Sequence, residues 1–171
     1  MKINLGCGDH YAQGGWVNVD HGSPHYADQR VNLITDTLPW LSRSVSHIYC
    51  GHVLEHLPLD ACHRLLKNLL QCMEQDGMIL VVGPDIDIAK QMIKDETFDF
   101  TYHSLESLRF GADRWEGDQH QWDCTGKAVM DLLRDAGWPI VVDIGIENAD
   151  PIWPIVDRES LWQCAILGVA W

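Results

Sequence analysis

The sequence predicts an α/β fold with a doubly wound, mostly parallel β-sheet, and three patterns indicate this class. Short apolar stretches typical of buried strands recur along the chain, with helical or polar stretches between them. A glycine-containing loop, residues 6–8, directly follows the first apolar stretch. An acid, Asp20, ends the second one. In parallel sheets such a loop and acid lie at the same edge, where ligands bind.

Each expected element follows from its local pattern. The strands are six apolar runs, at residues 2–5, 16–19, 47–50, 78–82, 139–146 and 162–170. The clearest helix covers residues 60–75, where leucines recur at helical spacing, and we expect Gly77 to end it in a left-handed conformation. A second helix covers about residues 127–135 and stops at Gly137. Because helices alternate with the strands, we expect both faces of the sheet to be covered.

The first loop has the features of a nucleoside-binding loop. Gly6 and Gly8 lack Cβ atoms, so the backbone can turn sharply and bring its amide groups close to a ligand. Asp20 can accept hydrogen bonds from both hydroxyls of a ribose. The third glycine of the dinucleotide fingerprint is missing, because Tyr11 occupies its position. Only fourteen residues separate Gly6 from Asp20, against about twenty in the usual layout, so we expect a shortened first helix or a loop.

Four segments in this order resemble motifs of the class I S-adenosylmethionine-dependent methyltransferases. They are N-L-G-C-G at residues 4–8, V-L-E-H-L at 53–57, the glycine turn, strand and Pro-Asp at 77–85, and the helix ending in Ala-Gly-Trp at 132–138. The resemblance covers nearly the whole chain. It implies one methyltransferase domain over residues 1–171, with a seven-stranded Rossmann-like sheet and an antiparallel C-terminal hairpin strand. It also implies S-adenosylmethionine as cofactor and methyl transfer as the reaction.

The same resemblance implies the cofactor-binding residues. They are Asn4, Gly6, Cys7, Gly8, Asp20, Thr37, Leu38 and His52. The adenine side falls to residues 32–38, and the methionine side to the end of the fourth strand at residues 50–52. Many family members carry an acid where this chain has Asn4, which could reach the amino acid end of the cofactor without supplying charge.

The segment from His52 to His56 reads as the H-x-x-E-H pattern of a metallopeptidase group. Pro58 follows two residues later, which disfavours a long metal-binding helix. Some quinone-biosynthesis methyltransferases resemble the segment and bind a divalent metal there, but His52 replaces their first acid. Three roles of this segment stay open. In the first, Glu55 and His56 have the structural role of holding the loop in place. In the second, His52 or His56 acts as a base or orients the acceptor. The third role is metal binding. We take His52 and His56 as catalytic candidates and expect no metal site.

An insertion at about residues 88–121 follows the fifth strand and can lie over the acceptor pocket as a lid. His103 and His120 are its candidate polar residues. Of the eight tryptophans, Trp115 and Trp122 are those we expect at a binding surface. Packing of an irregular segment against the sheet explains these residues equally well.

Composition limits the partners. The formal net charge of −13 repels a phosphate backbone, so nucleic acid is a disfavoured substrate, although Arg109 and Arg114 could form a local basic patch. No apolar run reaches the roughly 18 residues that span a bilayer. The first strand begins at once, which leaves no room for a signal peptide, so we expect a cytoplasmic protein.

The leading hypothesis is a methyltransferase acting on a small molecule, a glycan intermediate or a protein side chain. One alternative is a methyltransferase-like binding protein that keeps the cofactor pocket but does not catalyse methyl transfer. A more distant one is a nicotinamide-dependent oxidoreductase, because Asp20 could also bind the ribose of a nicotinamide cofactor. The missing third glycine and the length of 171 residues, which leaves no separate catalytic domain, count against it. The sequence leaves the acceptor and the oligomeric state open.

Overall fold

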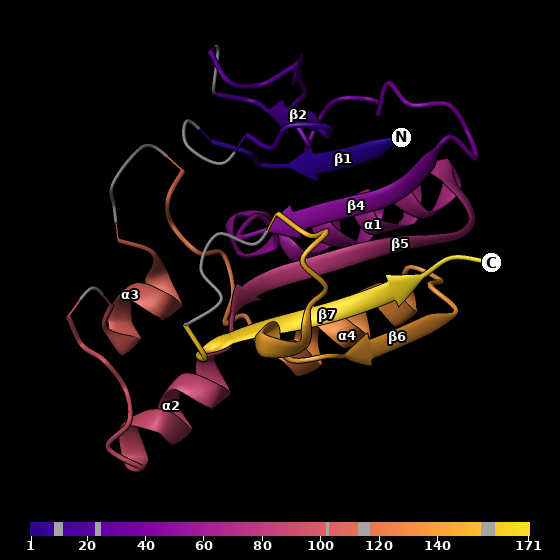
Figure 1. The fold of residues 1–171 in the computed structure, drawn as a ribbon. Helices are drawn as coiled ribbons and strands as arrows, with labels where there is room; N and C mark the ends of the chain where they lie inside the picture. Colours follow the sequence, from indigo (N-terminus) through magenta and orange to yellow (C-terminus); the bar gives the residue numbers. More distant parts are fainter. Residues whose placement is uncertain (9–11, 23–24, 102, 113–116, 155–159) are drawn as a thin grey trace.

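The computed structural model describes residues 1–8, 12–22, 25–101, 103–112, 117–154 and 160–171 (Figure 1). Its seven strands form one sheet in the order β3-β2-β1-β4-β5-β7-β6. They are β1 (Lys2–Leu5), β2 (Val17–Asp20), β3 (Gln29–Arg30), β4 (Val45–Gly51), β5 (Met73–Pro84), β6 (Ile140–Asp143) and β7 (Gln163–Val169). β7 runs antiparallel to both of its neighbours, and the pairs from β3 to β5 are parallel. The predicted mostly parallel sheet with an antiparallel C-terminal strand is confirmed.

The helices divide into two groups by position. They are α1 (Leu59–Cys72), α2 (Ile86–Lys94), α3 (Leu105–Phe110), α4 (Gly126–Asp135) and the short 3-10 helices η1 (Leu54–His56) and η2 (Ile146–Asn148). Helices α1 and α4 contact each other and lie behind the sheet in Figure 1. Helices α2 and α3 lie beyond the carboxyl ends of β4 and β5 (Figure 1). None of the helices in the described ranges is both long and apolar enough to cross a membrane.

Alternate residues of the central strands enter two different cores, as the period of a β-strand requires. Ile48 and Ile79 belong to the main core, together with buried leucines of α1 and Leu133 of α4. Tyr49 and Leu80 face the other side of the sheet. There they meet buried side chains outside the strands, namely Trp16, Ile146, Ala149 and Trp153. In the described part of the chain, helices α1 and α4 thus cover one face, while large side chains and the β6–β7 connection cover the other.

The end of α1 differs from the prediction. The helix stops at Cys72 instead of continuing to residue 75, because β5 begins at Met73, which pairs with Val45. The left-handed residue is Asp76, with φ of 59°, and the expectation that Gly77 adopts this conformation is wrong. A Cβ on Gly77 would lie 3.0 Å from the Glu74 carbonyl oxygen and 3.1 Å from that of Val45, so close approach of these backbone atoms explains the glycine. At the end of α4, Gly137 has the expected positive φ of 97°.

The connection between β1 and β2 is compact. Its described residues, 6–8 and 12–16, form turns and no helix, as the short spacing predicts; residues 9–11 lie outside the described ranges. Asn18 of β2 holds the next connection, because its backbone N–H donates to Asp28 Oδ2 at 2.8 Å. The sequence analysis missed β3, since two residues are too few for a periodic pattern.

The second core contains a histidine whose charge state should influence stability. His47 lies against the rings of Trp16 and Trp153, at centroid distances of 6.4 and 5.4 Å. Burial, and then the positive charge of Lys2, lower the pKa of His47 below 6.5, and Glu74 opposes them only in part. The unfolded chain therefore binds this proton more tightly. The stabilisation is complete above pH 6.5 and is lost as the pH falls through the lowered pKa.

We therefore expect His47→Gln to lose less stability than the wild type when the pH falls from about 7.5 to about 5.5. Urea unfolding at a series of pH values measures the difference. His63→Gln, a change at a histidine of α1, serves as the control and should follow the wild-type slope. If the slopes of wild type and His47→Gln were equal, His47 would not be a source of the pH dependence.

Candidate functional site

The loop after β1 is pinned between β2 and the segment that follows β4. Gly6 and Gly8 have positive φ values of 66° and 53°. The backbone N–H groups of Gly6 and Cys7 both donate to the Val19 carbonyl oxygen, at 2.8 and 3.2 Å. A Cβ on Gly6 would lie only 2.3 Å from Cγ2 of Val53. Both the left-handed backbone and the close approach require glycine at position 6.

Asp20 closes this loop from the end of β2. Its Oδ2 accepts from the Gly8 N–H at 2.9 Å, and its Oδ1 accepts from the Gly22 N–H at 2.7 Å. A carboxylate offers about four lone-pair sites, which is more than these two bonds occupy. The structure thus brings Gly8 and Asp20 together, as the sequence predicts, and gives Asp20 a second role in holding the loop.

Asn4 lies inside the sheet, with an exposed fraction of 2%. Its amide nitrogen donates to Oδ1 of Asn18 at 3.1 Å. The same oxygen accepts from the Gln13 N–H at 2.7 Å, so the two asparagines connect β1, β2 and the turn before β2. The sequence analysis missed Asn18, although an asparagine inside an otherwise apolar strand is a signal that could have identified it.

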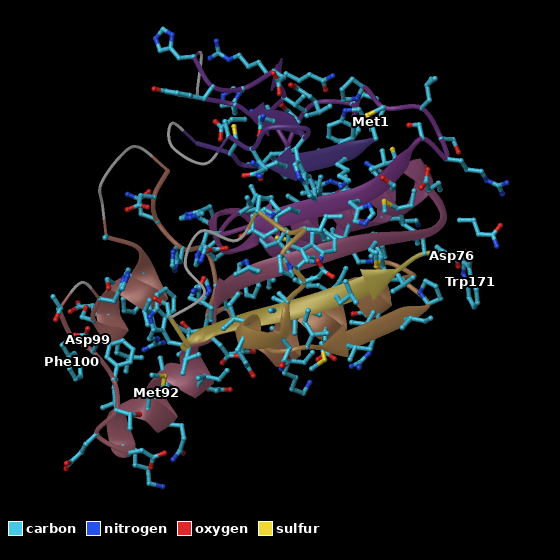
Figure 2. The ribbon with its side chains drawn as sticks, in the orientation of Figure 1. Met1, Asp76, Met92, Asp99, Phe100 and Trp171 are labelled. Atoms are coloured by element: carbon cyan, nitrogen blue, oxygen red, sulfur yellow. The ribbon has the colours of Figure 1, made fainter. Side chains whose placement is uncertain are left out.

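The segment at residues 32–38 lies beyond Asp20, next to β3. A cavity of about 340 Å³ opens there and is lined by Gln29, Arg30, Val31, Asp36, Thr37 and Pro39. Thr37 therefore faces open space, whereas Leu38 is half-buried against the main core. A second cavity, of about 520 Å³, includes Asp76 and Trp171 in its lining. These two residues lie at the end of the molecule opposite Met92 and Phe100 in Figure 2, away from the glycine loop, so we exclude that cavity from the site.

His52 follows β4 in a left-handed conformation, with φ of 53°. Its Nδ1 lies 3.1 Å from Oε1 of Glu55, and its Nε2 lies 2.7 Å from Oε1 of Gln163. The Gln163 amide nitrogen donates to the Ser160 carbonyl at 3.1 Å, which orients the amide oxygen toward His52. Both ring nitrogens therefore face oxygen acceptors, and the arrangement is fully satisfied when both carry protons. No sequence pattern could identify Gln163, because 111 residues separate it from His52.

Glu55 is the buried centre of this group, with an exposed fraction of 1%. Burial by itself raises the pKa of its carboxyl. The hydrogen bond with His52 and the positive charge that His52 and His56 can carry outweigh burial, and the pKa is lower than its ordinary value. Glu55 is therefore a carboxylate at neutral pH, although it lies in the protein interior.

The insertion after β5 brings a further histidine, His120, close to this carboxylate. The rings of His56 and His120 lie 4.9 Å apart in an edge-to-face arrangement. The Gln121 N–H donates to the Glu55 carbonyl oxygen at 2.7 Å, and Trp122 Nε1 donates to the Leu54 carbonyl at 3.1 Å. These bonds hold residues 120–122 against η1, so His56 and His120 belong to one cluster.

Other residues of the insertion have different roles from those expected. The indole of Trp122 anchors backbone carbonyls and does not form an open binding surface. Arg109 makes two hydrogen bonds with the carboxylate of Asp123, at 3.0 and 2.9 Å, so its charge is already paired. His103 lies against Trp162, with ring centroids 4.8 Å apart. Arg114 and Trp115 lie outside the described residues.

Gly6→Ala should destabilise the fold. A residue with a side chain costs roughly 1–2 kcal/mol in the left-handed region, and the contact with Val53 adds to this. We expect a loss of at least about 1 kcal/mol in the free energy of unfolding, measured by urea denaturation. Gly14→Ala is the matched control, since a Cβ there would meet no described atom within 4 Å. Equal stability of the two variants would contradict the tight packing of Gly6.

His52→Ala should destabilise the protein by about 1–3 kcal/mol, because it removes the hydrogen bond between His52 and the buried Glu55 carboxylate. Glu55→Gln in the same chain should recover part of this loss, since a neutral amide costs less to bury than a carboxylate. The free energies of unfolding of both single variants and the double variant form the test. Strictly additive effects would show that the two side chains do not interact.

The comparisons with known proteins agree with this geometry at the level of the fold. No protein-family model matches the chain, and no curated protein matches its sequence. The structure is similar to an S-adenosylmethionine-dependent methyltransferase from Thermotoga maritima, with a TM-score of 0.61 and 14% identity over 99% of this chain and 82% of that one. It is also similar to one from Methanosarcina mazei, with a TM-score of 0.58 and 14% identity over 99% of this chain and 91% of the other.

Human N-acetylserotonin methyltransferase, solved in complex with S-adenosylmethionine, has a TM-score of 0.57 and 17% identity over 99% of this chain. The chain spans about half the length of that enzyme, covering 47% of it. Identities this low show a shared fold and do not define an activity. The chain therefore has the fold of the class I S-adenosylmethionine-dependent methyltransferases.

Proposed function

We propose that this protein is an S-adenosylmethionine-dependent methyltransferase. The observation that carries the proposal is the loop Gly6–Gly8, held by Asp20 at the carboxyl ends of β1 and β2. In parallel sheets this is the edge where nucleoside ligands bind. The structural neighbours named above are methyltransferases, and the human one was solved with S-adenosylmethionine. The acid and the glycine loop fit the ribose and the amino acid ends of such a cofactor.

The proposed cofactor site extends from the glycine loop to β3. We assign the ribose hydroxyls to the Asp20 carboxylate, which ends β2 beside the glycine loop. The backbone of Gly6, Cys7 and Gly8 would lie beside the amino acid end, and the buried Asn4 bonds Asn18 of β2 beneath the loop. The adenine would lie along residues 32–38, where Thr37 lines a cavity and Leu38 packs behind it.

Bound S-adenosylmethionine supplies a methyl group on a sulfonium leaving group, so the protein has mainly to align an acceptor and exclude water. His52 is the residue best placed to handle the acceptor's proton. It follows β4 directly, its side chain is 43% exposed, and Glu55 orients its ring through Nδ1. To accept a proton at Nε2, His52 must be neutral, with its one ring proton on Nδ1 toward Glu55, and must exchange its bond with Gln163 for one with the acceptor. His56 is the second candidate, but its ring is turned toward His120.

The acceptor class is a small molecule, a glycan intermediate or a protein side chain. The net charge of −13 disfavours nucleic acid, and the pairing of Arg109 with Asp123 removes one of the two charges that could offset it. A catalytically silent binding protein remains the main alternative. The nicotinamide-dependent oxidoreductase has no support from the structural neighbours named here.

Calorimetric titration with S-adenosylmethionine and S-adenosylhomocysteine tests the cofactor. We expect folded protein to bind both, because the loop and Asp20 contact the part that the two ligands share. Absence of binding to either ligand would overturn the proposal. Binding of both without transfer to any member of a broad acceptor panel would favour the silent binding protein.

Asp20→Ala should weaken binding of both ligands by about 1–3 kcal/mol, the range for hydrogen bonds to a charged group. Asp20→Asn should lose less, since its amide oxygen can still accept one of the two loop N–H groups. Asp99→Ala removes a carboxylate far from the loop and should bind like the wild type (Figure 2). Affinity unchanged in a folded Asp20→Ala protein would refute the ribose role.

A further inference from the structure

We propose that Glu55, His56 and His120 form a binding site for a divalent transition-metal cation, with zinc as the expected occupant. Each of these residues offers one ligand atom, and the three atoms lie within 4.8 Å of one another. The inference goes beyond methyl transfer and does not depend on it. It also replaces the sequence-based expectation that the chain has no metal site.

His120 is held in the tautomer that a metal ligand needs. Its Nδ1 lies 2.8 Å from the Leu108 carbonyl oxygen, which can only accept, so Nδ1 carries the proton. In the neutral ring, Nε2 then has a free lone pair. Histidines that bind metals usually donate their other ring N–H to a carbonyl or a carboxylate in this way, which fixes the ring orientation.

His56 has an atom that the rest of the described structure leaves unsatisfied. Its Nδ1 is buried and has no hydrogen-bond partner among the described residues. A buried polar atom without a partner costs about 1–3 kcal/mol, so such atoms are uncommon in folded proteins. A cation bound by the cluster would offset this cost, because an imidazole nitrogen is a preferred ligand of zinc.

Glu55 supplies the negative charge. Its carboxylate is buried and bonds His52 through Oε1, and a carboxylate with two oxygens can also serve as a metal ligand. Two histidines and one glutamate are a known ligand set of catalytic zinc sites, which leave a further position open. Imidazole ligands select zinc and related transition metals over magnesium and calcium, which prefer oxygen.

The backbone holds the ligands near their required positions. Glu55 and His56 come from η1, and His120 comes from the insertion, which is tied to η1 by the bond from Gln121 N–H to the Glu55 carbonyl. Zinc–nitrogen bonds of about 2.0–2.1 Å place ligand atoms roughly 3.3 Å apart in a tetrahedral site. Side-chain rotation must therefore bring the three groups closer when the ion binds.

This ligand set differs from the one that the sequence pattern suggests. H-x-x-E-H pairs the two histidines of one short segment, but both ring nitrogens of His52 are already engaged, with Glu55 and Gln163. His120 takes the place of His52 in the cluster. The order of residues along the chain could not show this, because the insertion folds back onto η1.

Zinc titration of the full chain, after treatment with a chelator, tests the proposal without any cofactor. We expect one bound zinc ion per chain, measured by competition with a chromophoric chelator and by elemental analysis, and a higher melting temperature with zinc. His56→Ala and His120→Ala should each weaken zinc binding at least about tenfold, in line with loss of a ligand. His25→Ala, an exposed histidine outside the cluster, should bind zinc like the wild type.

Cobalt substitution identifies the ligand type. The bound cobalt should show the visible absorption of nitrogen and oxygen ligands and no thiolate charge-transfer band, since none of the three proposed ligands is a cysteine. Should His120→Ala fail to fold, His120→Gln, checked by circular dichroism, replaces it. The proposal is wrong if folded wild-type protein binds no zinc, if the His120 variants bind it with unchanged affinity, or if cobalt shows a thiolate band.

Discussion

The ionised carboxylate of Glu55, buried at the carboxyl end of β4, is the constraint on which the candidate site depends. An unpaired charge in the protein interior is strongly destabilising, so the surrounding groups must compensate it. His52 bonds its Oε1, and His56 and His120 each place a ring nitrogen within 4.8 Å of the carboxylate. His52 itself has a left-handed backbone, and its Nδ1 lies 3.1 Å from the carboxylate three residues further along the chain.

The same segment connects the two halves of the site. Val53 packs so closely on the glycine loop that only glycine fits at position 6, and Glu55 lies two residues further on. The proposed cofactor side and the histidine cluster therefore share one short stretch of backbone after β4. In the proposed arrangement, a shift of this stretch would therefore affect both the cofactor side and the histidine cluster.

Few helices surround the sheet, so the first loop takes its shape from bonds of its own. Helices α1 and α4 cover one face of the sheet, and tryptophans and the β6–β7 connection cover the other in the described ranges. Turns occupy the described part of the β1–β2 connection, where a longer helix is usual in such sheets. The loop therefore depends on its own backbone bonds to Val19 and on the Asp20 carboxylate for its shape.

The sequence by itself determined the fold class, the strand that ends in Asp20, the glycine loop and the short first connection, because these are local patterns of hydrophobicity and turn chemistry. It did not determine where α1 ends, since the pairing of Met73 with Val45 overrides the helical pattern. Only the tertiary structure decided the partners of the histidines. Gln163 and His120 reach the Glu55 group from distant parts of the chain, and such long-range contacts depend on how the elements pack together.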